Sequence, residues 1–136
     1  MKKLTGILPI APTPFHEDGR VDEDGMPRVL DCMIDQGVDA ICILANYSEQ
    51  FLLSDDERAL LMKISLEHVS NRVPVIVTIS HFASDIVVSR AKAAQAMGAD
   101  MLMMMPPYHG ALLKAGPKGI IEHFETVAAA SNVKIM

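Results

Sequence analysis

Short apolar segments recur along the chain at regular intervals, with longer amphipathic stretches between them. The apolar segments cover residues 6–11, 40–44, 74–79, 101–105 and 133–136. They are nearly continuous in hydrophobicity, which is typical of strands buried on both faces of a parallel sheet. The stretches between them carry apolar residues at helical spacing, as in Met26, Val29, Leu30, Met33 and Ile34. The pattern predicts five parallel strands joined by four helices, with right-handed crossovers.

Several residues mark the ends of these predicted helices. The segment Ser54-Asp55-Asp56-Glu57 has the capping-box pattern, in which a glutamate follows the capping serine by three positions. Ser84 is predicted to cap the third helix. Gly37 and Gly98 each stand between a helix and a strand, where a left-handed residue often ends the helix.

Two architectures fit this order of elements. A (β/α)8 barrel of about 250 residues would contain this chain as its first half, so that residues 1–136 form the N-terminal half of one barrel domain. A five-stranded, flavodoxin-like doubly wound sheet would fit the chain alone. Pro12-Thr13-Pro14-Phe15, rather than a glycine-rich phosphate loop, follows the first strand. The chain also stops inside an apolar run. Both observations favour the barrel.

The net charge, the lengths of the apolar runs and the cysteines limit the partners and the cellular compartment that we expect for this protein. The formal net charge of −5 disfavours nucleic acids and anionic membranes as partners. The apolar runs are strand-sized, far below the ~20 residues of a membrane span. Cys32 and Cys42 are in no metal-binding spacing and are interpreted as buried thiols, which is consistent with a cytoplasmic protein. No spacing of histidines, cysteines or carboxylates indicates a metal site, and we expect no cofactor.

The richest segment in candidate chemistry follows the second strand. There Asn46, Tyr47, Ser48 and Glu49 follow an apolar strand and precede the capped helix. Ligands of α/β proteins bind at the carboxyl ends of parallel strands. Successive backbone N–H groups in such a turn can hold a small anion.

Motifs in a fixed order along the chain match one known family. They are Thr13-Pro14-Phe15, the loop 46–49 with Leu53–Arg58, Pro74-Val75-Ile76, Gly98-Ala99-Asp100 and Pro106-Pro107-Tyr108. From Leu4 onward the chain resembles the dihydrodipicolinate synthase / N-acetylneuraminate lyase superfamily. The resemblance implies a (β/α)8 barrel, usually tetrameric, that forms a Schiff base between a lysine and the keto group of pyruvate or a 2-keto-3-deoxy sugar acid.

Three departures from the family pattern narrow the expected activity. The usual Gly-Thr-Thr-Gly-Glu loop reads Ala45-Asn46-Tyr47-Ser48-Glu49, the usual Tyr-Tyr pair reads Tyr108-His109, and Ser80-His81-Phe82 stands at a position that is normally rich in glycine. Loss of the second threonine and the second tyrosine argues against dihydrodipicolinate synthesis. The chain resembles the branch that dehydrates 2-keto-3-deoxy sugar acids, such as L-2-keto-3-deoxyarabonate dehydratase.

The resemblance also places the Schiff-base lysine on the sixth strand of the barrel. The sequence ends at Met136 within the fifth strand, so it looks truncated and lacks that lysine. Lys134 matches a non-catalytic position. We expect a half-barrel with unpaired strand edges to self-associate.

The resemblance assigns roles to several residues. The loop formed by Asn46, Tyr47 and Ser48 is predicted to bind the substrate carboxylate, while Glu49 is expected to brace it. Thr13 and His81 are predicted to contact substrate, although either could instead be satisfied within its own turn. Tyr108 and His109 are the candidate catalytic residues, because a histidine can deliver a proton near neutral pH. His16, His68 and His123 are interpreted as solvated.

Three functional hypotheses stay open from the sequence. The first is a Schiff-base hydro-lyase that dehydrates a 2-keto-3-deoxy sugar acid. The second is a pyruvate-dependent aldolase or a dihydrodipicolinate synthase-like enzyme of the same family. The third is an inactive fragment or a remnant that binds keto acids. The expected partners are a small keto acid and further copies of the chain.

Overall fold

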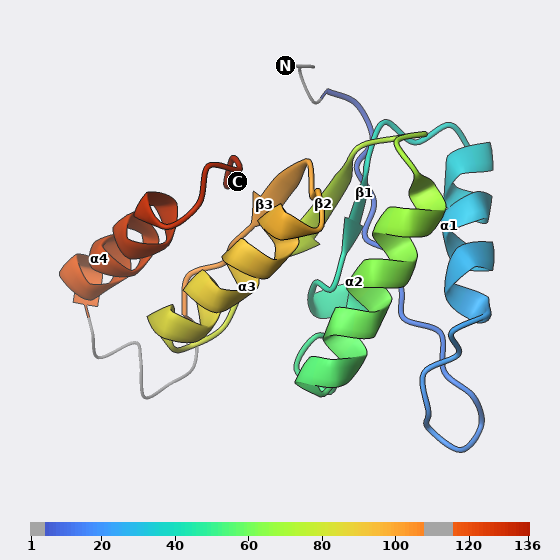
Figure 1. Ribbon diagram of the computed structural model, residues 1–136, viewed down its shortest axis with the longest axis horizontal. Coiled ribbons are helices and arrows are strands. Elements are labelled where there is room, and N and C mark those ends of the chain that lie inside the picture. Colours follow the sequence, from blue (N-terminus) through green and yellow to red (C-terminus); the bar gives the residue numbers. More distant parts are fainter. Residues whose placement is uncertain (1–4, 108–115) are drawn as a thin grey trace.

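The computed structural model describes residues 5–107 and 116–136, and shows a parallel sheet with helices alongside it (Figure 1). The elements follow the predicted alternation of strands and helices. In chain order they are α1 Gly25–Asp35, β1 Ile41–Ile43, the 3-10 turn η1 Asn46–Ser48, α2 Asp55–Val69, β2 Val75–Thr78, α3 Ser84–Ala96, β3 Met101–Met103 and α4 Gly116–Ala129.

The strands lie side by side in the order of the sequence. β1 pairs in parallel with β2, and β2 pairs in parallel with β3. Ile10 forms a parallel bridge with Cys42 on the free side of β1, and Ile135 does the same with Leu102 of β3. The first and fifth predicted strands are therefore in place, but each contributes a single bridge. Pro9, which has no N–H group, limits pairing in the first.

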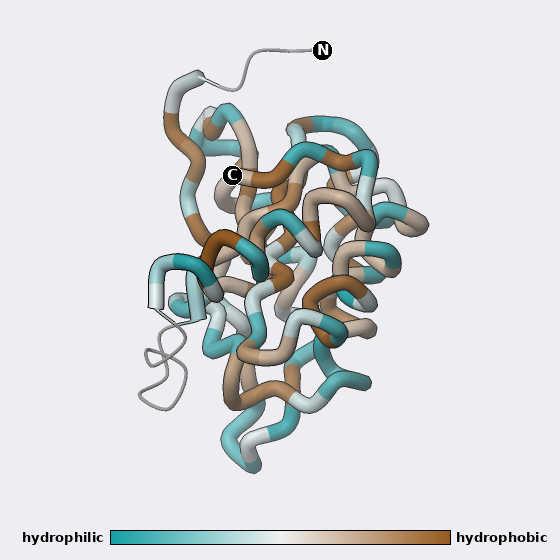
Figure 2. Tube along the Cα trace, turned by 90° about the vertical axis from the view of Figure 1, so that its left-hand side faces the viewer, coloured by the Kyte–Doolittle hydropathy of each residue, from teal (hydrophilic) through white to brown (hydrophobic). Residues whose placement is uncertain are grey.

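All four helices of the described part cover the same face of the sheet. The apolar core on that face contains Leu30 of α1, Leu61 of α2, Val87 of α3 and Val127 of α4, together with strand residues such as Ile41, Val77 and Leu102. The opposite face carries a separate cluster of Ala40, Cys42, Ala45 and Ile76, with Ile10, Met101 and Met103 beside it. Hydrophobic stretches recur along the trace, with hydrophilic ones between them (Figure 2).

This one-sided arrangement decides between the two predicted architectures. A doubly wound sheet carries helices on both faces and changes strand order at a switch point. A barrel keeps consecutive strands as neighbours and places every helix outside. The sequential order from Ile10 through β1, β2 and β3 to Ile135 is that of a barrel. The flavodoxin-like alternative does not fit this topology.

Two equivalent junctions fix the amino ends of the strands. Gly37 and Gly98 follow α1 and α3 with φ values of +78° and +86°, as the left-handed ends of these helices require. Two residues later, Asp39 accepts a hydrogen bond from the Ile7 N–H, and Asp100 accepts one from the Val75 N–H, both at 2.8 Å. Each aspartate thus ties a neighbouring segment of the sheet to its own strand.

The N-cap of α2 is the residue predicted from the sequence, and the N-cap of α3 is not. The Ser54 Oγ accepts the Glu57 N–H at 3.2 Å, and the Glu57 carboxylate accepts the Ser54 N–H at 2.8 Å, which completes the predicted capping box. Ser84 does not cap α3, because Ala83 is the N-cap and Ser84 is the first helical residue. The Ser84 hydroxyl instead pairs with Nδ1 of His123 at 2.7 Å.

Burial corrects two further predictions. Cys42 is buried as expected, but Cys32 is exposed on α1. His123 is only 5% exposed and lies between α3 and α4, so its interpretation as a solvated histidine was wrong. Its ring continues the apolar side of α4 that includes Val127, four positions later. Its Nδ1 has a partner in Ser84, whereas its buried Nε2 has none within the described residues.

We expect the stability of the protein to fall on acidification because of His123. Burial lowers the pKa of this imidazole from 6.5, so the unfolded chain takes up a proton at a higher pH than the folded chain. Stability is therefore lost as the pH falls below 6.5 and levels off once the folded histidine is also protonated. Thermal unfolding between pH 7.5 and 5 measures this loss. A His123→Asn variant should show a weaker pH dependence, and an unchanged dependence would contradict the assignment.

Candidate functional site at the carboxyl end of the sheet

The chain leaves β1 through a sharp turn that delivers polar groups to the carboxyl end of the sheet. Leu44, which is buried, adopts a left-handed φ of +59°, a conformation that is uncommon for a leucine. The 3-10 turn η1 follows at once. The N–H groups of Ser48 and Glu49 donate the hydrogen bonds that close this turn. The N–H groups of Asn46 and Tyr47 belong to its first two residues, which come before these donors in the chain.

Ser48 and Thr13 attach this turn to the first segment of the sheet. The Ser48 hydroxyl donates to the Ala11 carbonyl at 2.6 Å and accepts the Ala45 N–H at 3.1 Å. The Thr13 hydroxyl donates to the Ser48 carbonyl at 2.8 Å. Both side chains are buried. The structure thus brings these two predicted substrate-binding residues together, with their hydroxyls holding the turn in place.

Gln50 holds the other end of the turn. Its side chain is 2% exposed, and its Nε2 donates to Oδ1 of Asn46 at 2.6 Å. Nδ2 of Asn46 lies 3.7 Å from the sulfur of Met105, just beyond β3. Asn46 therefore spans the ends of two strands. Glu49, which was expected to brace the loop, is exposed, and within the described residues its side chain makes no hydrogen bond.

Arg58 of α2 is a buried cation beneath these turns. It is 5% exposed and donates to the Gln50 carbonyl at 3.3 Å and to the Thr78 carbonyl at 3.0 Å. It thereby connects the turn after β1 to the end of β2. Burial, and then the nearby charge of Arg90, lower the pKa of Arg58 to about 10. The guanidinium is still charged at neutral pH.

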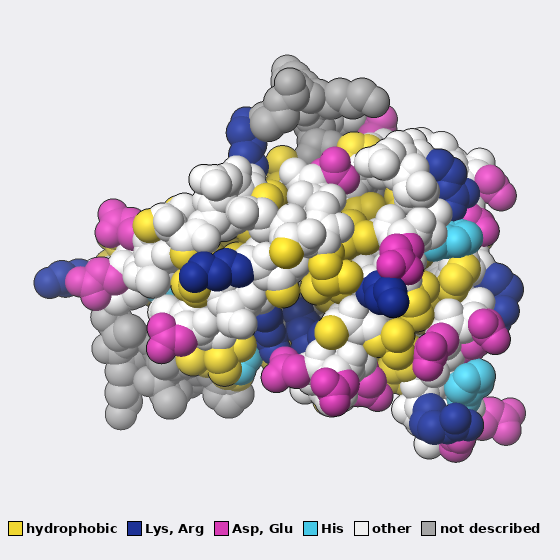
Figure 3. Space-filling model, in the orientation of Figure 1, with side chains coloured by type: hydrophobic (Ala, Val, Ile, Leu, Met, Phe, Trp, Pro, Cys, Tyr) yellow, Lys and Arg dark blue, Asp and Glu magenta, His cyan; other side chains and the backbone are white. Residues whose placement is uncertain are grey.

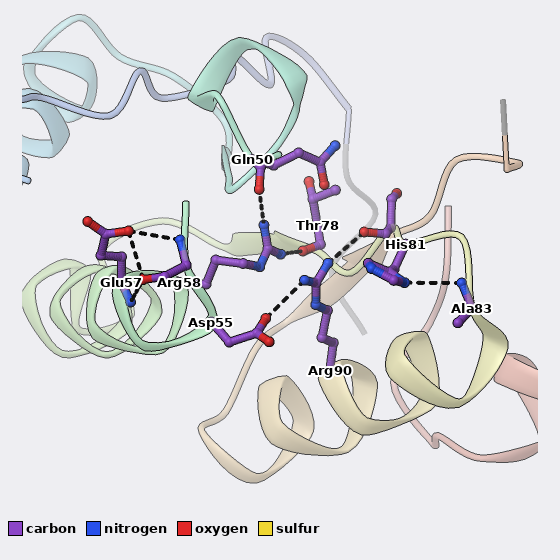
Figure 4. Close-up of polar contacts among 10 residues, drawn as sticks. Gln50, Asp55, Glu57, Arg58, Thr78, His81, Ala83 and Arg90 are labelled. Carbon is purple, nitrogen blue, oxygen red and sulfur yellow. Dashed lines mark hydrogen bonds and ion pairs between the residues drawn. The ribbon is translucent and has the colours of Figure 1, made fainter. Parts of the chain in front are cut away.

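Arg90 of α3 reaches the same region from the other side, and its guanidinium lies close to that of Arg58 (Figure 4). It donates to the Ser80 carbonyl at 2.8 Å and to the Asp55 carboxylate at 3.1 Å. The two arginines line a cavity of about 450 Å³ between α2 and α3, whose walls include Leu44, Met62 and Ile86. Basic side chains lie in this hollow, with acidic ones at its rim (Figure 3).

His81 lies at the exit of β2, on a neighbouring cavity. Its Nδ1 accepts the Ala83 N–H at 3.0 Å, so the neutral ring carries its proton on Nε2. Burial, and then the charge of Arg90, lower the pKa of His81 below 6.5. The cavity has a volume of about 610 Å³ and is also lined by Gln50, Phe51 and Phe82. The rings of Phe51 and Phe82 are stacked, with their centroids 5.5 Å apart.

The structure describes only part of the predicted site. Thr13, Asn46, Tyr47, Ser48 and His81 all follow strands at the same end of the sheet, and Tyr47 is 70% exposed there. Tyr108 and His109, the predicted catalytic pair, lie outside the described residues. The binding and catalytic roles of all seven residues remain predictions.

Gln50, Arg58 and Arg90 are parts of this region that sequence reasoning missed. A signal for Arg58 was present, because it falls on the same helical face as Leu61, Met62 and Ser65, all of which are buried. A cation on the apolar face of a helix requires buried partners. Its partners, however, are carbonyl groups on two different loops, and no local pattern identifies them.

Among residues 5–107 and 116–136, no group of three or more histidine, cysteine, aspartate or glutamate side chains is placed to hold a metal ion. In the same ranges, no helix is both long enough and apolar enough to cross a bilayer.

The chain is similar to known proteins over nearly its whole length. The model of the dihydrodipicolinate synthetase family matches residues 3–136. The chain belongs to this family. The match covers the strand exits, the capped helix α2 and the β3 exit that carry the candidate site.

Relatives and solved structures support this placement. L-2-keto-3-deoxyarabonate dehydratase of Azospirillum brasilense is 47% identical over 96% of this chain and 42% of its own length. YjhH of Escherichia coli K12, named a probable 2-dehydro-3-deoxy-D-pentonate aldolase, is 30% identical over 100% of this chain and 44% of its own. The crystal structure of YagE, a family member from E. coli K12 in complex with pyruvate, matches 97% of this chain with a TM-score of 0.90 and 30% identity.

These matches confirm the predicted family and barrel fold. The chain spans less than half the length of these proteins, with 42% to 44% of each covered. It corresponds to an N-terminal portion of the family barrel.

Proposed function

We propose that this chain belongs to a Schiff-base lyase that dehydrates a 2-keto-3-deoxy sugar acid. The observation that carries the proposal is the 47% identity to a dehydratase of such an acid, across nearly the whole of this chain. The polar groups at the strand exits are consistent with it, because the turn Asn46–Ser48 follows β1 and His81 lines a cavity at the exit of β2.

In this proposal the turn Asn46–Ser48 binds the carboxylate of the substrate. The leading N–H groups of a helical turn attract an anion. Ser48 and Thr13 keep the turn attached to the sheet through their hydroxyl groups. His81, with a proton on Nε2, can donate a hydrogen bond to a hydroxyl oxygen of the sugar acid. These residues bind and orient the substrate.

The chemical steps in this proposal require a lysine, which the family resemblance leads us to expect on a later strand. Condensation of its amine with the keto group releases water and gives an iminium, which acts as an electron sink. Removal of a proton from C3 then forms an enamine. The enamine electrons expel the hydroxyl group on C4, which leaves as water when an acid supplies a proton. Hydrolysis of the remaining imine takes up one water and releases both the product and the lysine amine. We assign this acid to His109, with Tyr108 beside it in the sequence.

Retro-aldol cleavage is the second candidate, because a relative named as a probable aldolase is 30% identical over the whole chain. Cleavage breaks a carbon–carbon bond and gives pyruvate and an aldehyde, whereas dehydration keeps all carbons in one product. The natively expressed protein should be incubated with 2-keto-3-deoxypentonates, and the products identified by mass. A single product lighter by one water supports the dehydratase. Formation of pyruvate and a two-carbon aldehyde would contradict the dehydratase and identify the activity as an aldolase.

The expected compartment and assembly belong to this proposal as well. A cytoplasmic enzyme that assembles into homo-oligomers would agree with the family resemblance. Size-exclusion chromatography with light scattering on the natively expressed protein would measure the assembly directly.

A further inference from the structure

The buried amide of Gln50 determines which way Asn46 faces. The Gln50 side chain is 2% exposed, and its Nε2 donates to Oδ1 of Asn46 over 2.6 Å. Asn46 itself is exposed at the end of β1. A short bond from a buried, packed donor to an exposed acceptor restricts the exposed side chain more than the buried one.

The orientation of the two amides follows from their surroundings. With Oδ1 of Asn46 toward Gln50, its N–H₂ group faces the sulfur of Met105 at 3.7 Å, and a thioether is a weak acceptor. Turning both amides around would place an oxygen against that sulfur. It would also bury the N–H₂ group of Gln50 with no acceptor. The arrangement that presents the N–H₂ group of Asn46 toward the end of β3 is therefore favoured.

Gln50 is fixed at its backbone as well. Its N–H donates to the Ala45 carbonyl at 3.2 Å, and its carbonyl accepts from Arg58 at 3.3 Å. These contacts connect it to β1 on one side and, through Arg58 and Thr78, to β2 on the other. The residue whose side chain binds Asn46 is thus anchored to the ends of two strands, β1 and β2.

Gln50 also carries a feature that is unfavourable for stability. Its Oε1 is buried, and within the described residues it has no hydrogen-bond partner. A buried acceptor without a partner lowers stability, so an apolar side chain of similar length would be at least as good for folding. The amide is useful through its other end, the Nε2 that holds Asn46.

We propose that Gln50 is a positioning residue for substrate binding, which fixes the Asn46 amide so that its N–H₂ group donates to an oxygen of the bound keto acid. The inference rests on the proposed function, because it requires a keto acid at the exit of β1. Gln50 thereby determines the affinity for the keto acid without touching it.

Gln50→Met tests this role, since methionine keeps the length of the side chain and removes both polar atoms. The natively expressed protein is titrated with pyruvate and trapped with borohydride, and the half-saturating pyruvate concentration is measured together with the Tm. We expect half-saturation to rise about tenfold, the effect of one lost hydrogen bond to a charged group, with the Tm unchanged or higher. The same substitution in an Asn46→Ala background should change half-saturation little. Gln36→Met, on an exposed glutamine of the α1 end, is the matched control.

The outcomes separate this inference from the proposed function. A lower Tm with unchanged half-saturation would make Gln50 a purely structural residue and overturn the inference. An equal rise in both backgrounds would also overturn it, because Gln50 would then act independently of Asn46. Absence of any pyruvate adduct in the unsubstituted protein would instead contradict the proposed function, and this role with it.

Discussion

Replacing His109 by glutamine is expected to slow dehydration of the sugar acid by about 100- to 10,000-fold, the usual contribution of a positioned general acid. Glutamine keeps hydrogen-bonding capacity but cannot deliver a proton. Formation of the pyruvate adduct should persist, because adduct formation expels no substrate hydroxyl. Steady-state turnover of 2-keto-3-deoxypentonates, measured beside borohydride trapping with pyruvate, checks both parts.

The control for this substitution is His16→Gln. His16 is half exposed on a different loop, 3.8 Å from Asp22. This variant should keep full turnover. If His109→Gln also kept full turnover, the acid would have to be sought elsewhere. If it lost adduct formation together with turnover, His109 would act in binding or in the first condensation rather than as the acid of the last step.

Replacing Arg58 by methionine is expected to lower the free energy of unfolding by about 2 kcal/mol, because two buried carbonyls lose their donor. Those carbonyls belong to Gln50 and Thr78. Relief of repulsion from Arg90 offsets part of this loss, since the two cations lie close together. Arg58→Lys should be intermediate, as one ammonium group cannot reproduce the fork of a guanidinium. Urea unfolding followed by circular dichroism measures all three proteins.

Arg28→Met is the matched control for Arg58. Arg28 is also on a helix, but its side chain is 70% exposed and pairs with Asp22 on the surface. Such pairs contribute about 0–1 kcal/mol. Equal stability of Arg58→Met and the unsubstituted protein would show that the two carbonyls find other donors, and that Arg58 does not hold the turn after β1.

Local patterns predicted much of the fold because the features they report are local. The capping box at Ser54 and Glu57 lies within one turn of helix, and Gly37 and Gly98 are required by the backbone where they stand. The repeated alternation of strand and helix predicted the barrel-type order. The exact cap of α3 was missed by one residue: Ala83 is the N-cap, and its N–H donates to the His81 ring.

The contacts beneath the site could not be predicted in this way. Arg58 binds a carbonyl twenty residues further along the chain, and His123 meets Ser84 across two helices. Such pairs depend on how β1, β2 and their helices are placed in space. The burial of His123 and the exposure of Cys32 follow from the same placement. The sequence pattern indicates which polar residues follow the strands. Only the structure shows which of their side chains are hydrogen-bonded within the protein.

Trapping of a pyruvate adduct tests the central claim most directly. The natively expressed protein is incubated with pyruvate and borohydride, and its intact mass is then measured. A chain heavier than the 14.8 kDa of these 136 residues, carrying one reduced pyruvyl group, is the predicted result. A protein that takes up no pyruvyl group at saturating pyruvate would contradict the claim that these residues are part of a Schiff-base lyase.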